Sequence, residues 1–137
     1  MPDPAATLSQ VFEAQAQKYG ARAFLKDKPG KVWTDHSFGE ISDAVGKLRA
    51  GLPSLGVRPG DRVAILSDNC PGWIVVDQAV LGLGAIVVPL YTTSGPEETA
   101  HVINDSGAKI IAANGPEMIK KILGLGSSIP GLAAIIA

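Results

Sequence analysis

The sequence GDRVAILSDNCPGWIVVDQAVLGLGAIVVPLY, residues Gly60–Tyr91, carries the strongest hydrophobic pattern in the chain. Two continuous apolar runs, within Arg62–Leu66 and Ala85–Leu90, predict two buried strands. Because neither run alternates apolar with polar residues, both suit parallel strands that helices cover on both faces.

The segment between the two runs predicts a helical connection. A turn at Ser67–Cys70 leads into a predicted helix over Pro71–Leu83, in which only Asp77 and Gln78 interrupt the apolar residues. Such a helix is expected to be largely buried. Strand, helix and strand together predict a βαβ unit with a right-handed crossover.

Composition excludes several classes of function. The 137 residues include 12 Lys and Arg against 13 Asp and Glu, giving a net charge of −1, so we expect no nucleic-acid-binding face. The single cysteine, Cys70, rules out a disulfide framework and fits a reducing compartment. Met1–Pro4 has no apolar stretch and therefore predicts no secretory signal, so we expect a cytoplasmic protein.

The apolar run Trp73–Leu90 raises the question of a membrane span. It contains Asp77, and an aspartate near the middle of a span costs about 2.5–3.5 kcal/mol. Pro89 and the strand-like second half also disfavour a spanning helix. We therefore expect no transmembrane segment.

Two capping boxes predict helices in the N-terminal part. Thr7–Gln10 begins a helix that Gly20 ends, and Ser37–Glu40 begins a second, amphipathic helix. Pro53 removes a backbone donor, so the second helix should end or kink just before it.

Between these helices the sequence predicts a β-hairpin. The segments Ala23–Lys26 and Lys31–Thr34 have strand character and flank a short polar connection. Pro29 and Gly30 within that connection form a turn signal.

After the βαβ unit, the alternation of helix and strand continues. Ser94 with Glu97 fits a third capping box, and Gly107 should end that helix. The remaining predicted elements are a strand at Lys109–Ala113, a helix at Pro116–Leu123 and a strand at Gly131–Ala137. The predicted fold class is α/β, with a mainly parallel sheet, helices on both faces and an N-terminal β-hairpin.

The apolar segment Gly131–Ala137 at the C-terminus is unusual, because chain ends are normally polar. We expect residues 1–137 to form a single partial domain that is cut at its C-terminus. An open apolar sheet edge of this kind should favour self-association.

A pocket, if this chain has its own, is expected at the carboxyl ends of the parallel strands. The residues expected to line it are Ser67, Asp68, Asn69, Tyr91, Thr92 and Thr93. Ordinary turn and helix-cap roles account for the same residues and stay open as the simpler interpretation.

The histidines and the cysteine, which could act as metal ligands or catalytic groups, have no suitable partner residues near them in the sequence. His36 and His101 lie far apart without metal-ligand spacing, and Cys70 has no nearby base. We therefore predict no catalytic residue, no cofactor-binding residue and no metal ligand.

Glycine-containing segments do not predict a nucleotide site. Gly82–Gly84 and Gly124–Gly126 lack the third glycine of a dinucleotide fingerprint. The segment Thr92–Glu98 resembles the start of a phosphate loop, but Glu97 and Glu98 would repel a triphosphate.

Several ordered motifs resemble the N-terminal region of AMP-forming acyl-CoA synthetases, which are adenylate-forming enzymes, with the long-chain fatty acid branch nearest. The carrying residues are Trp33-Thr34, Ser37-Phe38, Leu55–Leu66, Asn69, Pro71 and Trp73, Val88–Tyr91 and Ile103–Lys109. The sequence departs from the family pattern at Pro53, Gly72 and Thr92, which puts local stability in doubt more than kinship.

The resemblance implies a reaction that needs further motifs. Members of this family activate a fatty acid or other carboxylate with ATP and Mg²⁺ to an acyl-adenylate, then transfer the acyl group to CoA. They bind the triphosphate with a Ser/Thr/Gly-rich loop ending in Pro-Lys-Gly and with later acidic, arginine and lysine residues. None of these motifs occurs in this sequence.

Two functional hypotheses follow. The first is an N-terminal fragment of a fatty acyl-CoA synthetase that binds no cofactor and is inactive alone, whereas the full-length form is cytoplasmic or peripheral to a membrane. The alternative is a stand-alone, non-catalytic α/β binding or interaction module.

Overall fold

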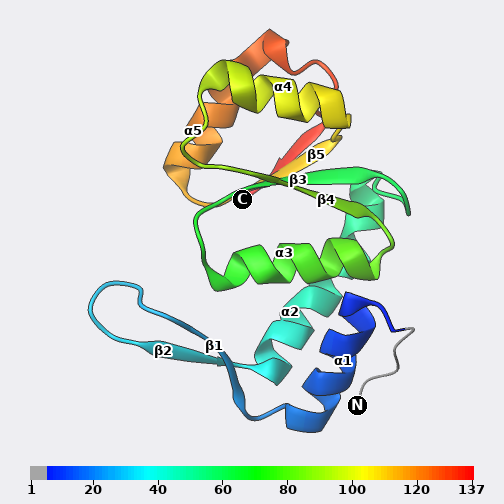
Figure 1. Ribbon diagram of the computed structural model, residues 1–137, viewed down its shortest axis with the longest axis vertical. Helices are drawn as coiled ribbons and strands as arrows, with labels where there is room; N and C mark the ends of the chain where they lie inside the picture. The colour runs from blue at the N-terminus through cyan, green and yellow to red at the C-terminus, as the bar shows by residue number, and fades with distance from the viewer. Residues whose placement is uncertain (1–5) are drawn as a thin grey trace.

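The computed structural model describes residues 6–137, which alternate helices and strands (Figure 1). In chain order the elements are α1 (Leu8–Tyr19), β1 (Ala23–Asp27), β2 (Thr34–Ser37), α2 (Phe38–Gly51), η1 (Leu52–Leu55), β3 (Arg62–Leu66), α3 (Pro71–Gly82), β4 (Ile86–Leu90), α4 (Pro96–Ser106), β5 (Ile110–Ala113), α5 (Pro116–Leu125), η2 (Gly126–Ser128) and β6 (Ala134–Ile136).

The central sheet is parallel, with the strand order β4-β3-β5-β6. β3 pairs with β4 on one side and with β5 on the other, and β6 adds to β5. β1 and β2 form a separate antiparallel hairpin. The predicted α/β class, with a mainly parallel sheet and an N-terminal hairpin, is confirmed.

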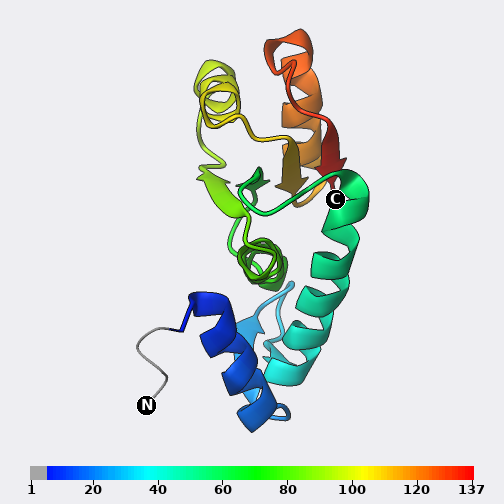
Figure 2. The ribbon, with the colours of Figure 1, turned by 90° about the vertical axis from the view of Figure 1, so that its right-hand side faces the viewer.

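Helices cover both faces of the sheet (Figure 2). α4 and α5 lie on one face and α3 on the other, and α1 and α2 pack against α3. Side chains of the strands belong to two separate hydrophobic cores. Val63 and Ile110 pack in the core of α1–α3, whereas Leu66 and Ile111 pack in the core of α4 and α5. The sheet is therefore the middle layer of three.

Capping residues and proline in the sequence predicted most of the helix ends correctly. Two of the three predicted capping boxes are present, at Thr7 with Gln10 and at Ser37 with Glu40. The hydrogen bond from the Ser37 backbone also lowers the pKa of Glu40. Pro53 lies in the short 3₁₀ turn η1, which ends α2 as predicted.

The predicted third capping box, at Ser94 and Glu97, is wrong. Gly95 is the N-cap of α4, and Pro96 occupies the first helical position. The residue before a proline disfavours helical backbone angles, so Gly95 stays extended and the helix starts one residue later than Ser94 would require.

Two strand predictions also need correction. The predicted second hairpin strand, Lys31–Thr34, lies mostly in a loop, because the antiparallel backbone pairing ends with Asp27 opposite Thr34 and leaves residues 28–33 outside the ladder. The side-chain contacts Lys26–Asp35 (2.9 Å) and Asp27–His36 (3.0 Å) are consistent with this register. β4 was expected to be covered on both faces, yet it is an edge strand, and Ile86 is 51% exposed.

Side chains around the amino end of β3 link it to the end of α4 and to the start of β5. Arg62 donates from Nε to the carbonyl of Ser106 at 2.7 Å and so satisfies the C-terminus of α4. Beside it, Lys109 Nζ lies 2.9 Å from Asp61 Oδ1. This hydrogen bond from Lys109, together with one from the Arg58 backbone, lowers the pKa of Asp61.

Leu66→Ala tests the two-sided burial of β3. Leu66 is 0% exposed, so the substitution should destabilise the fold by about 2–5 kcal/mol in urea unfolding. Leu123→Ala is the matched control: Leu123 is 66% exposed on α5 and should change the free energy of unfolding by no more than about 0.5 kcal/mol. Equal effects of the two substitutions would contradict this assignment of the core.

Asp61→Asn tests the ion pair with Lys109. Because folding lowers the pKa of Asp61, its carboxylate stabilises the fold above the ordinary aspartate value of about 3.9. That contribution is lost as the pH falls through the lower, folded-state pKa. We expect a reduced Tm for the variant at neutral pH and a shrinking difference from wild type in acid. Asp43→Asn, at an exposed position on α2, should leave Tm unchanged at both pH values.

Candidate functional site

The carboxyl edge of the sheet brings together the polar residues that follow β3 and β4. Leu66 pairs with Leu90, so the turns that begin at Ser67 and Tyr91 lie side by side. A hollow of about 450 Å³ at this edge is lined by Ser67, Asp68, Asn69, Trp73, Pro89, Leu90, Tyr91 and Thr92. Five of the six residues predicted from sequence therefore lie around one hollow, and Thr93 is outside its lining. That this hollow binds a ligand stays a prediction.

Hydrogen bonds from two side chains, Thr92 and Lys121, hold the walls of this hollow. The Thr92 hydroxyl donates to Asp68 Oδ1 at 3.0 Å and joins the two turns. Lys121, from α5, donates to the carbonyl of Thr92 at 2.9 Å and also to that of Ser94. The ammonium group of Lys121 therefore connects α5 to the start of the β4–α4 connection.

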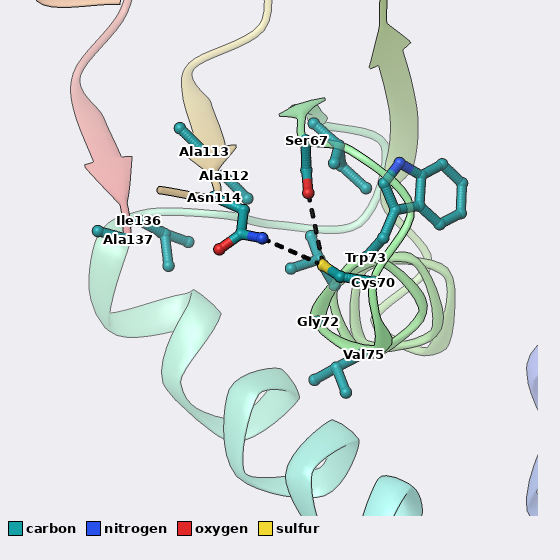
Figure 3. A pocket seen from close by; sticks show the side chains of 12 residues that line it. Ser67, Cys70, Gly72, Trp73, Val75, Ala112, Ala113, Asn114, Ile136 and Ala137 are labelled. Carbon is teal, nitrogen blue, oxygen red and sulfur yellow. Dashed lines mark hydrogen bonds between the residues drawn. The ribbon is translucent and has the colours of Figure 1, made fainter. Parts of the chain in front are cut away.

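An apolar pocket of about 200 Å³ adjoins this hollow (Figure 3). It lies between the start of α3 and the carboxyl ends of β3, β5 and β6, and it shares Ser67 and Trp73 with the polar hollow. Its further lining includes Ile65, Val75, Val76, Ala112 and Ile136. Because Ser67 and Trp73 line both, the apolar pocket and the polar hollow lie next to each other.

Cys70 supplies the polar centre of the apolar pocket. Asn114 donates from Nδ2 to Cys70 Sγ at 3.3 Å, and Ser67 Oγ lies 3.5 Å from the same sulfur (Figure 3). Figure 3 shows these three side chains converging from β3, β5 and the start of α3. The thiol is therefore held by hydrogen bonds as part of the pocket wall.

Sequence reasoning did not predict that Asn114 and Ile136 line the same pocket as Cys70. A usable signal exists for Asn114: it directly follows β5 as Ser67 follows β3, and Leu66 is in register with Ala113. Ile136 has no comparable signal, because its position depends on β6 joining β5.

The glycine pairs lie where phosphate binding is disfavoured. Gly82 ends α3 and Gly124 lies in the last turn of α5, so both are at the carboxyl ends of helices, where the dipole is negative. The start of α4 carries Glu97 and Glu98. Since Lys121 already binds two carbonyl oxygens at the neighbouring loop, this edge does not present a donor set that fits a triphosphate with Mg²⁺.

The histidines serve separate local environments. His36 Nε2 lies 3.0 Å from Asp27 in the hairpin, whereas His101 is exposed on α4. Within residues 6–137, His, Cys, Asp and Glu side chains form no group of three that could hold a metal ion. Every helix in the same range is too short or too polar to span a bilayer.

Comparison with known proteins identifies the family. The family model of AMP-binding enzymes matches residues 12–133. The chain belongs to the AMP-binding enzyme family. A long-chain-fatty-acid–CoA ligase of Mycobacterium bovis, FadD15, is 36% identical over 105 residues, which cover 77% of this chain and 18% of that protein. The chain thus spans less than a fifth of the length of this relative.

Solved structures of adenylate-forming enzymes share the fold. A crystal structure described as a long-chain-fatty-acid CoA ligase from Rhodopseudomonas palustris superposes with a TM-score of 0.83 at 28% identity, covering 96% of this chain and 33% of that chain. The N-terminal domain of FACL13 from Mycobacterium tuberculosis gives a TM-score of 0.82 at 20% identity, with the same coverage. The chain is therefore a fatty acyl-CoA ligase-like segment of the AMP-binding enzyme family, and its fold is that of the N-terminal part of these enzymes.

Thr92→Val tests the contact that joins the two turns of the hollow. Loss of the hydrogen bond to Asp68 should cost about 0.5–1.5 kcal/mol in urea unfolding. Thr93→Val, at the next and exposed position, is the matched control and should have a smaller effect. The same loss in both variants would show that the Asp68 contact does not stabilise this edge.

Proposed function

We propose that this chain is the N-terminal structural part of a fatty acyl-CoA synthetase. The whole enzyme activates a fatty acid with ATP to an acyl-adenylate, releases pyrophosphate and transfers the acyl group to the thiol of CoA. The observation that carries the proposal is the 36% identity to a long-chain-fatty-acid–CoA ligase, supported by the AMP-binding family match over residues 12–133. Residues 1–137 then form a partial domain of a cytoplasmic enzyme.

In this proposal the chain contributes shape and rigidity to the enzyme and leaves the phosphate chemistry to other parts. ATP, Mg²⁺ and CoA belong to the whole enzyme. The carboxyl edge of the sheet carries Asp68, Glu97 and Glu98, whose charges oppose a triphosphate. Adenylation needs positive charge and backbone donors along the triphosphate, which the Pro-Lys-Gly loop of the family supplies and this sequence lacks.

The proposal predicts that the purified chain alone is catalytically inactive. With ATP, Mg²⁺ and a long-chain fatty acid, it should give no carboxylate-dependent ATP–pyrophosphate exchange above a reaction without protein. A full-length long-chain-fatty-acid–CoA ligase serves as the positive control for the assay. Exchange that depends on both the chain and the fatty acid would overturn the assignment of the chemistry to other parts.

The coding sequence after Ala137 distinguishes the synthetase from a stand-alone module. Continuation into a Ser/Thr/Gly-rich loop ending in Pro-Lys-Gly supports the synthetase, and a stop codon favours the module.

A further inference from the structure

The dipeptide Asn114-Gly115 lies at the carboxyl end of β5, in the short connection to α5. Asn114 is exposed, and its backbone N–H donates to the carbonyl of Leu66 at 3.3 Å, which extends the β3–β5 pairing by one residue. Its side chain points toward Cys70, and Nδ2 donates to the sulfur at 3.3 Å (Figure 3). The side-chain amide of Asn114 is therefore accessible to water and also part of the wall of the apolar pocket.

Glycine after asparagine removes the main obstacle to an attack of the backbone on the side-chain amide. The Gly115 nitrogen has no neighbouring β-carbon, so it can approach Cγ of Asn114 without steric hindrance. Within residues 6–137, the Gly115 N–H makes no backbone hydrogen bond that this attack would have to break. Gly115 has φ 83° and ψ 159°, a conformation that is essentially restricted to glycine. The fold thus requires, directly after Asn114, the residue that most favours the reaction.

The other two asparagines of the chain lack these conditions. Asn104 lies inside α4, where the N–H of the following residue belongs to the helical hydrogen-bond pattern. The side chain of Asn104 is also held, because it donates to the carbonyl of Ser128 at 2.7 Å. Asn69 precedes Cys70, whose β-carbon hinders the approach of the backbone nitrogen. Asn114 is therefore the asparagine at which backbone attack is favoured.

We propose that Asn114 is a site of spontaneous deamidation that changes the polarity around Cys70. The backbone nitrogen of Gly115 loses its proton to solvent and bonds to Cγ of Asn114, while the Cγ–Nδ2 bond breaks and ammonia leaves. The cyclic imide then takes up one water, which opens either of its two C–N bonds and gives an aspartyl or an isoaspartyl residue. Water is the co-reactant, and no group is oxidised or reduced. This inference does not depend on the proposed enzymatic reaction.

Deamidation exchanges a hydrogen-bond donor for a negative charge in a mostly apolar wall. The amide of Asn114 donates to Cys70 Sγ, whereas an ionised carboxylate has no proton to donate. A carboxylate beside the sulfur also disfavours the thiolate, which is the nucleophilic form of cysteine. Conversion of Asn114 should therefore lower the reactivity of Cys70 toward alkylating reagents.

Ageing of the folded chain, followed by peptide mass spectrometry, tests the modification. The purified chain is incubated at mildly alkaline pH, and its asparagines are monitored for conversion to aspartyl and isoaspartyl forms. We expect Asn114 to react about tenfold faster than Asn69 or Asn104, which corresponds to a barrier lower by about 1.4 kcal/mol. Comparable rates at these positions would overturn the proposal, as would conversion of Asn114 only after unfolding in urea.

Alkylation by iodoacetamide tests the consequence for Cys70, which is the single cysteine of the chain. Asn114→Asp reproduces the aspartyl product and should react severalfold more slowly than freshly purified wild type. Gln17→Glu makes the same change from amide to carboxylate at an exposed position on α1, so it is the matched control and should leave the rate unchanged. Equal slowing in both variants, or no slowing in Asn114→Asp, would contradict the proposed effect on the thiol.

A third variant connects ageing to the change at the sulfur. Asn114→Gln keeps a side-chain amide, but its longer side chain does not form the five-membered imide. During ageing with a reducing agent, which prevents oxidation of Cys70, wild type should lose alkylation rate as Asn114 converts, whereas Asn114→Gln should keep its rate. The same loss in both proteins would assign the change to a cause other than Asn114.

Discussion

The arrangement of the described residues depends on the parallel pairing of β3 with β4 on one side and β5 on the other. Side chains of β3 alternate between the two cores, with Val63 facing α1–α3 and Leu66 facing α4 and α5. A strand that is enclosed on both faces and both edges must be apolar throughout, which is why the continuous run Val63–Leu66 was informative in the sequence. The helices of both layers are positioned by this one strand.

Signals that act over a few residues allowed most of the fold to be predicted. The capping boxes at Thr7 and Ser37 and the bounds of β3 depend only on local sequence, and the structure has them as predicted. The errors arise where a competing interaction decides. Pro96 overrides Ser94 as the start of α4, and the backbone pairing of Asp27 with Thr34 places β2 further along the chain than predicted. The exposure of β4 follows from its edge position, which its apolar sequence does not reveal.

The candidate site was predictable to the extent that it follows from the strand-end rule. Asp68 and Thr92 come from consecutive parallel strands, and they meet in a direct hydrogen bond. The apolar pocket was not predictable in the same way, because Cys70, Asn114 and Ile136 come together only through the strand order β3-β5-β6. Strand order is a property of packing between elements, and the apolar strands of this chain do not differ enough in sequence to encode it visibly.

The adjacency of the polar hollow and the apolar pocket bears on the role of this edge. A fatty acid has a polar head and an apolar tail, and the two hollows, which share Ser67 and Trp73, have the same division of polarity. Polarity alone does not activate a carboxylate, however, because the developing charge on the triphosphate must be neutralised. Lys121 cannot readily supply that charge, since its ammonium group binds the carbonyl oxygens of Thr92 and Ser94 and maintains the loop. Under the proposed function, this edge therefore acts as a rigid wall against which the phosphate-binding parts of the enzyme are built.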